Sequence, residues 1–453
     1  MNNFTLRIFS KLPSIVQKFW ERVEDSDIGS RIAKGSFWAL IGSVVSQGLM
    51  LLASIVIARI LGKTEFGELG MIRSTVNMFA VFAGFGLGLT ATKYIAEFRI
   101  KDKDKTGKII GLTTLFAGGM GGIIAIAILI SAPFLAEKTI NAPQLVNEIR
   151  LGAVMLFFSA LNGSQTGTLV GFEAFKTIAK VNLIAGALAF PIQIGFTLMY
   201  GMPGSVIGFG LNFLILWLLN FIAVRKESFK FGITIQFKNS FNEWPVLYKF
   251  SLPALLSGLM VSPVIWACNA MLVNQPKGYD EMAIFDAANQ WRSAILFIPA
   301  VLSQIALPLL TSANKQNQFN RILKLNVFIN FIIALLMAIV ISLFSSFIMK
   351  TYGKSFAEGN IVLIILAFST VLISINGVIG QAFASKGRMW IGFLFNSIWG
   401  ITLLISSFIL LKLGYGAKGL AYSFLISYVI HTIVQIIYAN RYLLKPSQTI
   451  VQK

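Results

Sequence analysis

The sequence has few of the residues that support chemistry in water. Cys268 is the only cysteine among 453 residues, which excludes an intramolecular disulfide and a dithiol redox mechanism. His431 is the only histidine, and a single histidine in an apolar stretch is more often packed between helices than used as a proton relay. Charged residues make up 12% of the chain, against roughly 25% in soluble domains. We expect neither a cofactor nor a metal site.

Apolar residues dominate the chain, which is 56% hydrophobic with a mean hydropathy of +0.76. The charges lie in short patches between apolar runs of about 20 residues, each long enough to cross a ~30 Å hydrocarbon core as a helix. The sequence therefore predicts an all-α polytopic membrane protein with twelve transmembrane helices. The expected spans are Gly35–Ala58, Met71–Thr90, Ile109–Ser131, Leu151–Gly171, Val181–Tyr200, Ser205–Val224, Phe250–Val273, Ala283–Leu310, Val327–Met349, Ile361–Gly380, Met389–Leu411 and Gly419–Ile437.

An internal repeat organises these spans. The segment YGMPG at 200–204 recurs as YGAKG at 415–419, an offset of 215 residues. Six spans per half give both halves the same orientation, so the repeat predicts two six-helix lobes related by a pseudo-two-fold along the membrane normal. Further marks recur at offsets of 213 or 214: Phe66 and Glu68 as Tyr279 and Glu281, Asn162-Gly163 as Asn376-Gly377, and Asn182 and Gly186 as Asn396 and Gly400.

Basic residues set the expected topology. With the N-terminus inside, cytoplasmic segments collect 27 Lys and Arg and outer loops collect 9, which predicts two cytoplasmic termini. This bias also accounts for the net charge of +20 through topology and contact with anionic lipids, so we expect no nucleic-acid partner. The expected organisation is a cytoplasmic amphipathic segment at 1–34, lobes at 35–224 and 250–437, a basic cytoplasmic linker at 225–249, and a cytoplasmic tail at 438–453.

Three ionisable residues lie within the spans: Arg73, Asp286 and Arg292. A charge at membrane depth costs roughly 2.5–3.5 kcal/mol, so each needs a partner, water or a function. Helical periodicity places Asp286 on one face with Asn289, Gln290 and Ser293, and Arg292 at the margin of that face. The second span carries Arg73 one turn from Asn77, aligned by the repeat with Asp286 and Gln290. The candidate cavity residues are therefore Arg292, Arg73, Asp286, Asn289, Gln290 and Asn77.

Each candidate also has a structural interpretation. Arg73 lies near the outer end of its predicted span, so reaching the interface is an alternative to ligand contact. Asp286 either neutralises Arg73 or Arg292, or takes part in transport. Arg292, roughly 13 Å into its predicted span, is the strongest functional candidate. Single amides either line the lumen or join neighbouring helices; these are Gln47, Asn162, Gln165, Gln193, Asn269 and Gln304.

Several segments resemble a known family. They are RIAKGSFW at 31–38, ARILGKTEFG at 58–67, GFGLGLT at 84–90 followed by KYIAE at 93–97, and GQAFASKGRMW at 380–390 followed by Asn396. The sequence resembles the polysaccharide-repeat (O-antigen, Wzx-type) flippases of the multidrug/oligosaccharidyl-lipid/polysaccharide exporter superfamily, over essentially its whole length.

The resemblance implies a non-enzymatic transporter of the cytoplasmic (inner) membrane with a cationic central cavity. The implied substrate is an undecaprenyl-diphosphate-linked oligosaccharide, moved to the outer leaflet by alternating access for surface polysaccharide biosynthesis. Arginine suits this substrate because a guanidinium can hold phosphate oxygens in pairs. Anionic membrane lipids are further expected partners, and the resemblance leaves open a partnership with other polysaccharide-assembly proteins.

Three alternatives remain from the sequence. A cation-coupled drug or metabolite antiporter of the same superfamily should carry embedded carboxylates in both lobes, whereas the first lobe has only Glu68 and Glu97 near helix ends. A lipid II flippase should add two spans after the twelfth. A membrane glycosyltransferase or polymerase should place catalytic groups in a large outer loop, and the longest expected outer loop is 132–150.

Overall fold

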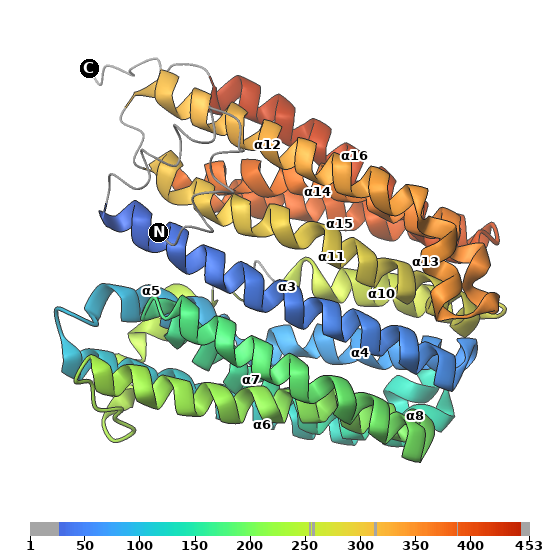
Figure 1. The fold of residues 1–453 in the computed structure, drawn as a ribbon, viewed down its shortest axis with the longest axis horizontal. Coiled ribbons are helices and arrows are strands. Elements are labelled where there is room, and N and C mark those ends of the chain that lie inside the picture. Colours follow the sequence, from blue (N-terminus) through green and yellow to red (C-terminus); the bar gives the residue numbers. More distant parts are fainter. Residues whose placement is uncertain (1–26, 253–254, 256–258, 312–314, 387, 445–453) are drawn as a thin grey trace, which may run out of the picture.

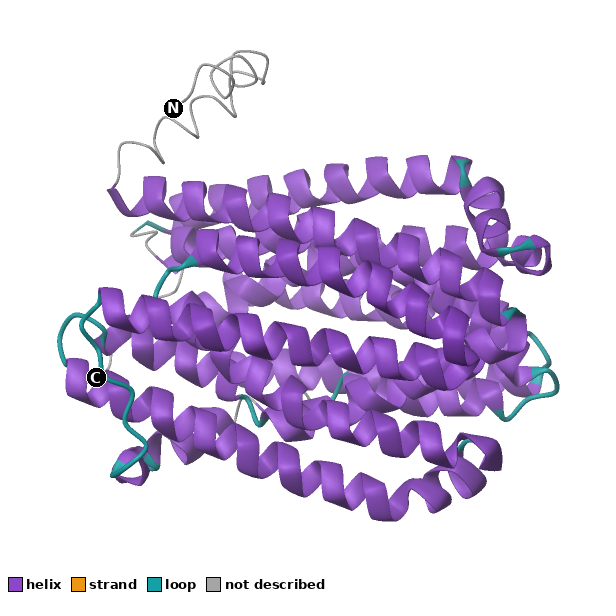
Figure 2. Ribbon diagram, turned by 60° about the horizontal axis from the view of Figure 1, so that its bottom comes forward, coloured by secondary structure: helices purple, strands orange, loops and turns teal. Residues whose placement is uncertain are grey.

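Long helices account for nearly all of the chain in a computed structural model, which describes residues 27–252, 255, 259–311, 315–386 and 388–444. Within these residues no strand is present (Figure 2). Most of the amphipathic segment expected at 1–34 lies outside the described residues. The helices are α3 (Asp27–Leu61), α4 (Lys63–Gly84), α5 (Leu87–Phe98), α6 (Lys103–Phe134), α7 (Val146–Gly171), α8 (Phe175–Lys230), α10 (Ser262–Val273), α11 (Gly278–Thr311), α12 (Gln316–Leu343), α13 (Ser345–Tyr352), α14 (Asn360–Ser385), α15 (Met389–Lys412) and α16 (Gly416–Tyr438).

These helices correspond to the predicted spans. Among the described residues, eight helices are long and apolar enough to cross a membrane, or nine when α4 and α5, bent by 42°, count as one span. The helix α8 contains two spans, because Gly201 breaks it with φ 59° and ψ −132°. The two remaining predicted spans coincide with α10, a shorter apolar helix of 12 residues, and with α11. Helices are the expected solution because a lipid-embedded backbone must satisfy its hydrogen bonds internally.

The packing of the helices repeats between the two halves. In the first lobe α3 packs on α8, while α7 packs on α4 and α6; in the second lobe α10 packs on α15, while α14 packs on α11 and α12. Between the lobes α4 contacts α11 and α10, and α11 contacts α3 (Figure 1). If α3 corresponds to α10 and α4 to α11, the contact of α4 with α10 is equivalent to the contact of α11 with α3. A two-fold axis between the lobes requires this equivalence.

The repeated glycines occupy equivalent positions in the two lobes. A Cβ on Gly186 of α8 would lie 2.7 Å from the hydroxyl oxygen of Ser46 on α3, and one on Gly400 of α15 would lie 3.3 Å from Val264 on α10. The glycines of the repeated YG pair, Gly201 and Gly416, both have positive φ, 59° and 50°. The repeated glycines therefore lie at close helix contacts and at tight turns, where only glycine fits without strain.

The lobes meet at one end of the molecule and diverge toward the other end, where α3 begins and α16 ends (Figure 1). At this junction end, Thr64 donates a hydrogen bond to Asp280 at 2.6 Å, and Arg59 donates to the carbonyl oxygen of Thr351 at 2.6 Å. Gly67 lies so close to Tyr279 that a Cβ would overlap its carbonyl oxygen. The junction end is therefore closed by direct contact between the lobes.

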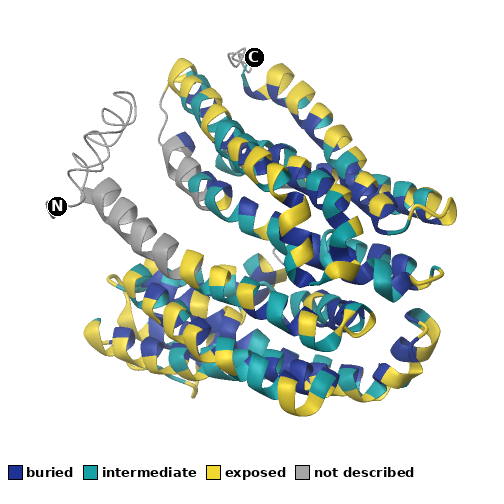
Figure 3. Cartoon of the chain, turned by 45° about the vertical axis from the view of Figure 1, so that its right-hand side comes forward, coloured by how far each residue is buried: buried dark blue, intermediate teal, exposed yellow. Residues whose placement is uncertain are grey.

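Burial follows the same plan. The largest apolar cluster includes residues of both lobes, and Phe66 of the first lobe packs its ring 6.1 Å from that of Tyr352 in the second. Large apolar side chains such as Ile130, Phe347 and Trp390 are exposed, and exposed positions follow the outer faces of the helices (Figure 3). This distribution fits a protein surrounded by lipid.

Candidate functional site

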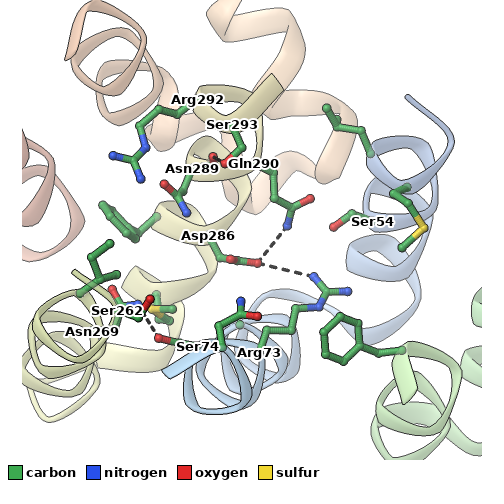
Figure 4. A pocket seen from close by; sticks show the side chains of 18 of the residues that line it. Ser54, Arg73, Ser74, Ser262, Asn269, Asp286, Asn289, Gln290, Arg292 and Ser293 are labelled. Atoms are coloured by element: carbon green, nitrogen blue, oxygen red, sulfur yellow. Dashed lines mark hydrogen bonds and ion pairs between the residues drawn. The ribbon is translucent and has the colours of Figure 1, made fainter. Parts of the chain in front are cut away.

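A polar cavity of about 630 Å³ lies between the two lobes. Helices α3, α4, α8, α10 and α11 line it, and Figure 4 shows many of its side chains. All six residues predicted from the sequence line this cavity. Its polar lining consists of Gln47, Ser54, Arg73, Ser74, Asn77, Gln193, Ser262, Asn269, Asp286, Asn289, Gln290, Arg292 and Ser293.

Helix α11 supplies the largest share of this polar wall. Asp286, Asn289, Gln290 and Ser293 line the cavity together, as their helical spacing predicts. The amide of Gln290 donates a hydrogen bond to Asp286 at 2.9 Å, one helical turn away. Arg292, expected at the margin of this face, also reaches the cavity (Figure 4).

The carboxylate of Asp286 is paired with Arg73 from the other lobe. Arg73 Nη1 lies 3.7 Å from Asp286 Oδ2, and the two side chains are 16% and 14% exposed. The guanidinium of Arg73 also lies 5.5 Å from the ring centroid of Phe209. Of the two partners considered for Asp286, the structure selects Arg73.

Arg73 lies farther from the start of its helix than its predicted span suggested. Helix α4 begins at Lys63, eight residues before the predicted start at Met71, so Arg73 is ten residues, or about 15 Å, into the helix. The early residues of this helix include Glu65 and Glu68, which hydropathy assigns to a loop. In the structure Arg73 lines the central cavity and pairs with Asp286.

Arg292 is the cation of the cavity that has no counter-ion among the described residues. It is 8% exposed, its guanidinium lies 4.8 Å from the ring centroid of Phe424, and Tyr428 is its hydrogen-bonding neighbour. Within the described part of the chain it makes no ion pair, and its Nε and Nη1 atoms are buried without a hydrogen-bond partner. Leaving buried donors of a charged group without hydrogen bonds costs free energy. An anion or a water molecule that accepted these bonds would therefore stabilise the guanidinium.

Arg292 is likewise farther from the start of its helix than predicted. Helix α11 begins at Gly278 rather than Ala283, which places Arg292 fourteen residues, or about 21 Å, into the helix. Among the described residues that line the cavity, Asp286 is the only acidic one, and the arginines are Arg73 and Arg292. The lining therefore carries one more positive than negative charge.

The single amides in the spans divide into two groups. Gln47, Gln193 and Asn269 line the cavity, and Asn269 donates a hydrogen bond to Ser74 of the other lobe at 2.9 Å. Asn162 instead joins helices within the first lobe, because it donates to the carbonyl oxygen of Phe213 at 2.8 Å. Gln165 is buried and is not part of the cavity lining. The side chain of Gln304 lies outside the described residues.

Sequence reasoning missed the small and aromatic members of the lining. Ser74 and Ser262 line the cavity, but single serines in apolar helices carry no distinguishing signal. Phe209 lines it as well, and Phe424 and Tyr428 contact Arg292 from α16. In a chain with 39 phenylalanines, such residues cannot be separated from packing and lipid-facing aromatics without the fold.

Comparison with known proteins agrees with this architecture. The family described as "Polysaccharide biosynthesis protein" matches residues 32–314, which is more than half of the chain. The chain belongs to this family. Among its relatives, the EPS I polysaccharide export inner membrane protein EpsE of Ralstonia nicotianae is 23% identical over 395 residues, covering 84% of this chain and 88% of that protein. The lipid III flippase of Escherichia coli is 23% identical over 300 residues, covering 64% of this chain and 70% of that protein.

Solved structures share the fold of this polysaccharide biosynthesis family protein. An inward-facing multidrug resistance MATE family transporter of the MOP superfamily superimposes with a TM-score of 0.70 at 17% identity, covering 88% of this chain and 94% of that chain. A MOP superfamily transporter from Pyrococcus furiosus gives a TM-score of 0.68 at 16% identity, covering 91% and 96%. These likenesses confirm the predicted all-α polytopic membrane fold.

Proposed function

We propose that this family member is a flippase that moves an oligosaccharide linked to polyprenyl diphosphate from the cytoplasmic to the outer leaflet of the inner membrane. The product would supply surface polysaccharide biosynthesis. The names of its relatives, a polysaccharide export protein and a lipid III flippase, support this class of substrate. The single observation that carries the proposal is the buried, unpaired guanidinium of Arg292.

The chemistry of Arg292 fits a diphosphate. Its Nε and Nη1 atoms have no hydrogen-bond partner among the described residues, and a guanidinium forms strong charge-assisted hydrogen bonds with phosphate oxygens. Deep in a protein such charge-assisted bonds are stronger than in water. A lipid diphosphate that entered the cavity would neutralise Arg292 and satisfy donors that have no partner among the described residues.

The rest of the lining fits a sugar. Amides and hydroxyls surround the charged groups, and Asn77, Asn289 and Gln47 offer both donors and acceptors to sugar hydroxyls. The volume of about 630 Å³ falls within the range of ordinary small-molecule sites. The cavity therefore suits a charged head with attached sugars while the polyprenyl chain stays in the lipid.

The arrangement of the lobes supports alternating access. The junction end is closed by contacts such as Thr64 with Asp280, while the helices diverge at the end where α3 begins and α16 ends (Figure 1). The basic loops predict that the end where α3 begins faces the cytoplasm. We therefore propose that this conformation accepts its substrate from the cytoplasmic side, and that transport opens the junction end.

A cation-coupled antiporter is the principal alternative, and Asp286 is the residue that would favour it. A coupling carboxylate must exchange its cation or proton during transport. Here Asp286 is paired with Arg73 and accepts a hydrogen bond from Gln290. The flippase accounts for Arg292 as well, whereas a cation carrier gains nothing from an unpaired cation in its cavity.

The test is to remove the charge of Arg292. Arg292→Ala should abolish flipping at a near-normal protein level, because it deletes a counter-ion rather than a packing group. Arg292→Lys should restore activity only in part, since an ammonium cannot form the paired contacts. Complementation of a strain that lacks its own flippase, with immunoblots for protein level, measures both. Arg150→Ala, at an exposed arginine outside the cavity, serves as the control. Full activity of Arg292→Ala would contradict the proposal.

A further inference from the structure

A second hollow, of about 500 Å³, lies on the side of α10 near the junction end. Its walls come from both lobes. Trp266 and Met271 belong to α10, Phe408 and Lys412 belong to α15, and Thr139 ends a π-helical turn (Leu135–Thr139) of the first lobe. We call this hollow the junction groove. It is separate from the central cavity, with which it shares no lining residue.

Helix α10 is the partition between the two spaces. Ile265 and Asn269 line the central cavity, whereas the neighbouring positions Trp266 and Ala270 line the junction groove. Only the thickness of one helix therefore separates the cavity from the groove.

The floor of the groove is part of the contact between the lobes. The indole of Trp266 donates a hydrogen bond to the hydroxyl of Thr75 on α4 at 3.0 Å. The amide of Asn274 donates to the carbonyl oxygen of Thr139 at 2.8 Å. Both bonds join the second lobe to the first. If the junction end opened, these bonds would break and the groove would lose one of its walls.

The chemistry of the groove is that of an amphiphile site. Its walls are mainly apolar, and its basic residue, Lys412, lies in the last turn of α15. This lysine is exposed, its ammonium lies 5.8 Å from the ring centroid of Phe408, and it makes no ion pair with any residue that the structure describes. A lysine at the end of a membrane helix places its charge at the level of lipid phosphates.

We propose that the junction groove binds an anionic phospholipid, with an acyl chain along Trp266 and Phe408 and the phosphate at Lys412, and that this lipid stabilises the closed junction end. The reason is linkage: a ligand that contacts both lobes binds the closed conformation better and shifts the population toward it. The proposal concerns a bilayer lipid, so it holds whatever substrate the central cavity carries.

Site-specific photo-crosslinking tests the binding. The full chain carries a benzophenone amino acid at position 408 or 409 and is reconstituted in phosphatidylcholine vesicles that contain phosphatidylglycerol. Phe408 lines the groove and Ile409 does not, although they are 57% and 50% exposed at nearly the same depth. The yield of cross-linked phosphatidylglycerol should be several-fold higher from position 408 than from position 409. Lys412→Gln should remove the difference, and Lys350→Gln, at an exposed lysine outside the groove, should leave it unchanged.

Cross-linking between the lobes tests the stabilisation. Thr64 and Asp280 face each other across the junction end, so a Thr64→Cys, Asp280→Cys variant in a Cys268→Ser background reports its closure. Phosphatidylglycerol should raise the disulfide yield several-fold, and Lys412→Gln should abolish that rise. Equal labelling at positions 408 and 409 would reduce the groove to ordinary lipid contact. That result would overturn the proposal. So would cross-linking of position 408 to phosphatidylcholine as strongly as to phosphatidylglycerol, or a disulfide yield that does not change when phosphatidylglycerol is added.

Discussion

Replacing Asp286 by asparagine should destabilise the protein unless Arg73 is neutralised in the same variant. The two side chains form an ion pair between the lobes, with 3.7 Å between Arg73 Nη1 and Asp286 Oδ2. Asp286→Asn leaves the guanidinium of Arg73 buried without a counter-ion, and Arg73→Gln leaves the carboxylate in the same position. An unpaired buried charge is the costly state, whereas two neutral amides in contact are not.

The expected magnitude follows from the geometry. Two unit charges at this separation attract each other by about 4 kcal/mol at an effective dielectric constant of 20. The pair borders a polar cavity and is 16% and 14% exposed, so water weakens the attraction. We expect each single variant to lose about 2 kcal/mol, somewhat less than the 3–5 kcal/mol of fully buried pairs. With a coupling energy of about 3 kcal/mol, the double variant should lose only about 1 kcal/mol, so it should be more stable than either single variant.

A double-mutant cycle on unfolding in mixed detergent micelles measures this coupling. The control cycle uses Lys108 and Asp104, an i,i+4 pair with side chains 25% and 61% exposed, for which about 0.3–0.5 kcal/mol is expected. If the coupling of Arg73 with Asp286 were no larger than in the control, the pairing would be energetically irrelevant. If Asp286→Asn and the double variant both accumulated normally but failed to transport, Asp286 would instead act in the transport step.

Two further predictions concern topology and the tight turns. Reporter fusions after Lys108 and Lys230 should read cytoplasmic, and a fusion within 132–150 should read external; an external signal at Lys230 would refute the arrangement of six spans in each lobe. Gly201→Ala should destabilise the protein by about 1–3 kcal/mol, because φ 59° with ψ −132° is open only to glycine. Gly195→Ala, at a site with open space in the same helix, should be neutral in the same unfolding assay.

The repeat was the most informative part of the sequence for the fold. It predicted equivalent contacts in the two lobes, and Gly186 and Gly400 make such contacts with the first helix of their respective lobes. Helix boundaries were harder to predict. Hydropathy detects the stretch of a helix that lies in hydrocarbon, whereas α4 continues through the polar residues Lys63 and Glu65 beyond it. The start of α4 was placed eight residues too late for this reason.

The cavity was predictable as a list of residues but not as an arrangement. Asp286, Asn289 and Gln290 share a helical face, so periodicity alone brings them together. Which arginine pairs with Asp286 depends on how the two lobes approach each other, and the local sequence does not encode that distance. The contact of Arg292 with Tyr428 depends on how closely α16 packs against α11, which the local sequence of neither helix encodes.

The turns at Gly201 and Gly416 have a consequence for biogenesis. At each of them two long helices follow one another with almost no connecting segment. The sharp change of direction rests on glycines of positive φ: Gly201 at the first turn, and Gly414 with Gly416 at the second. Each such pair is a helical hairpin that can enter the bilayer as one unit. Since moving polar backbone through hydrocarbon costs several kcal/mol for each unsatisfied group, a hairpin without a loop keeps the barrier to insertion low. A polar insertion at either turn should therefore slow the insertion of the nascent chain into the membrane before it affects the stability of the folded protein.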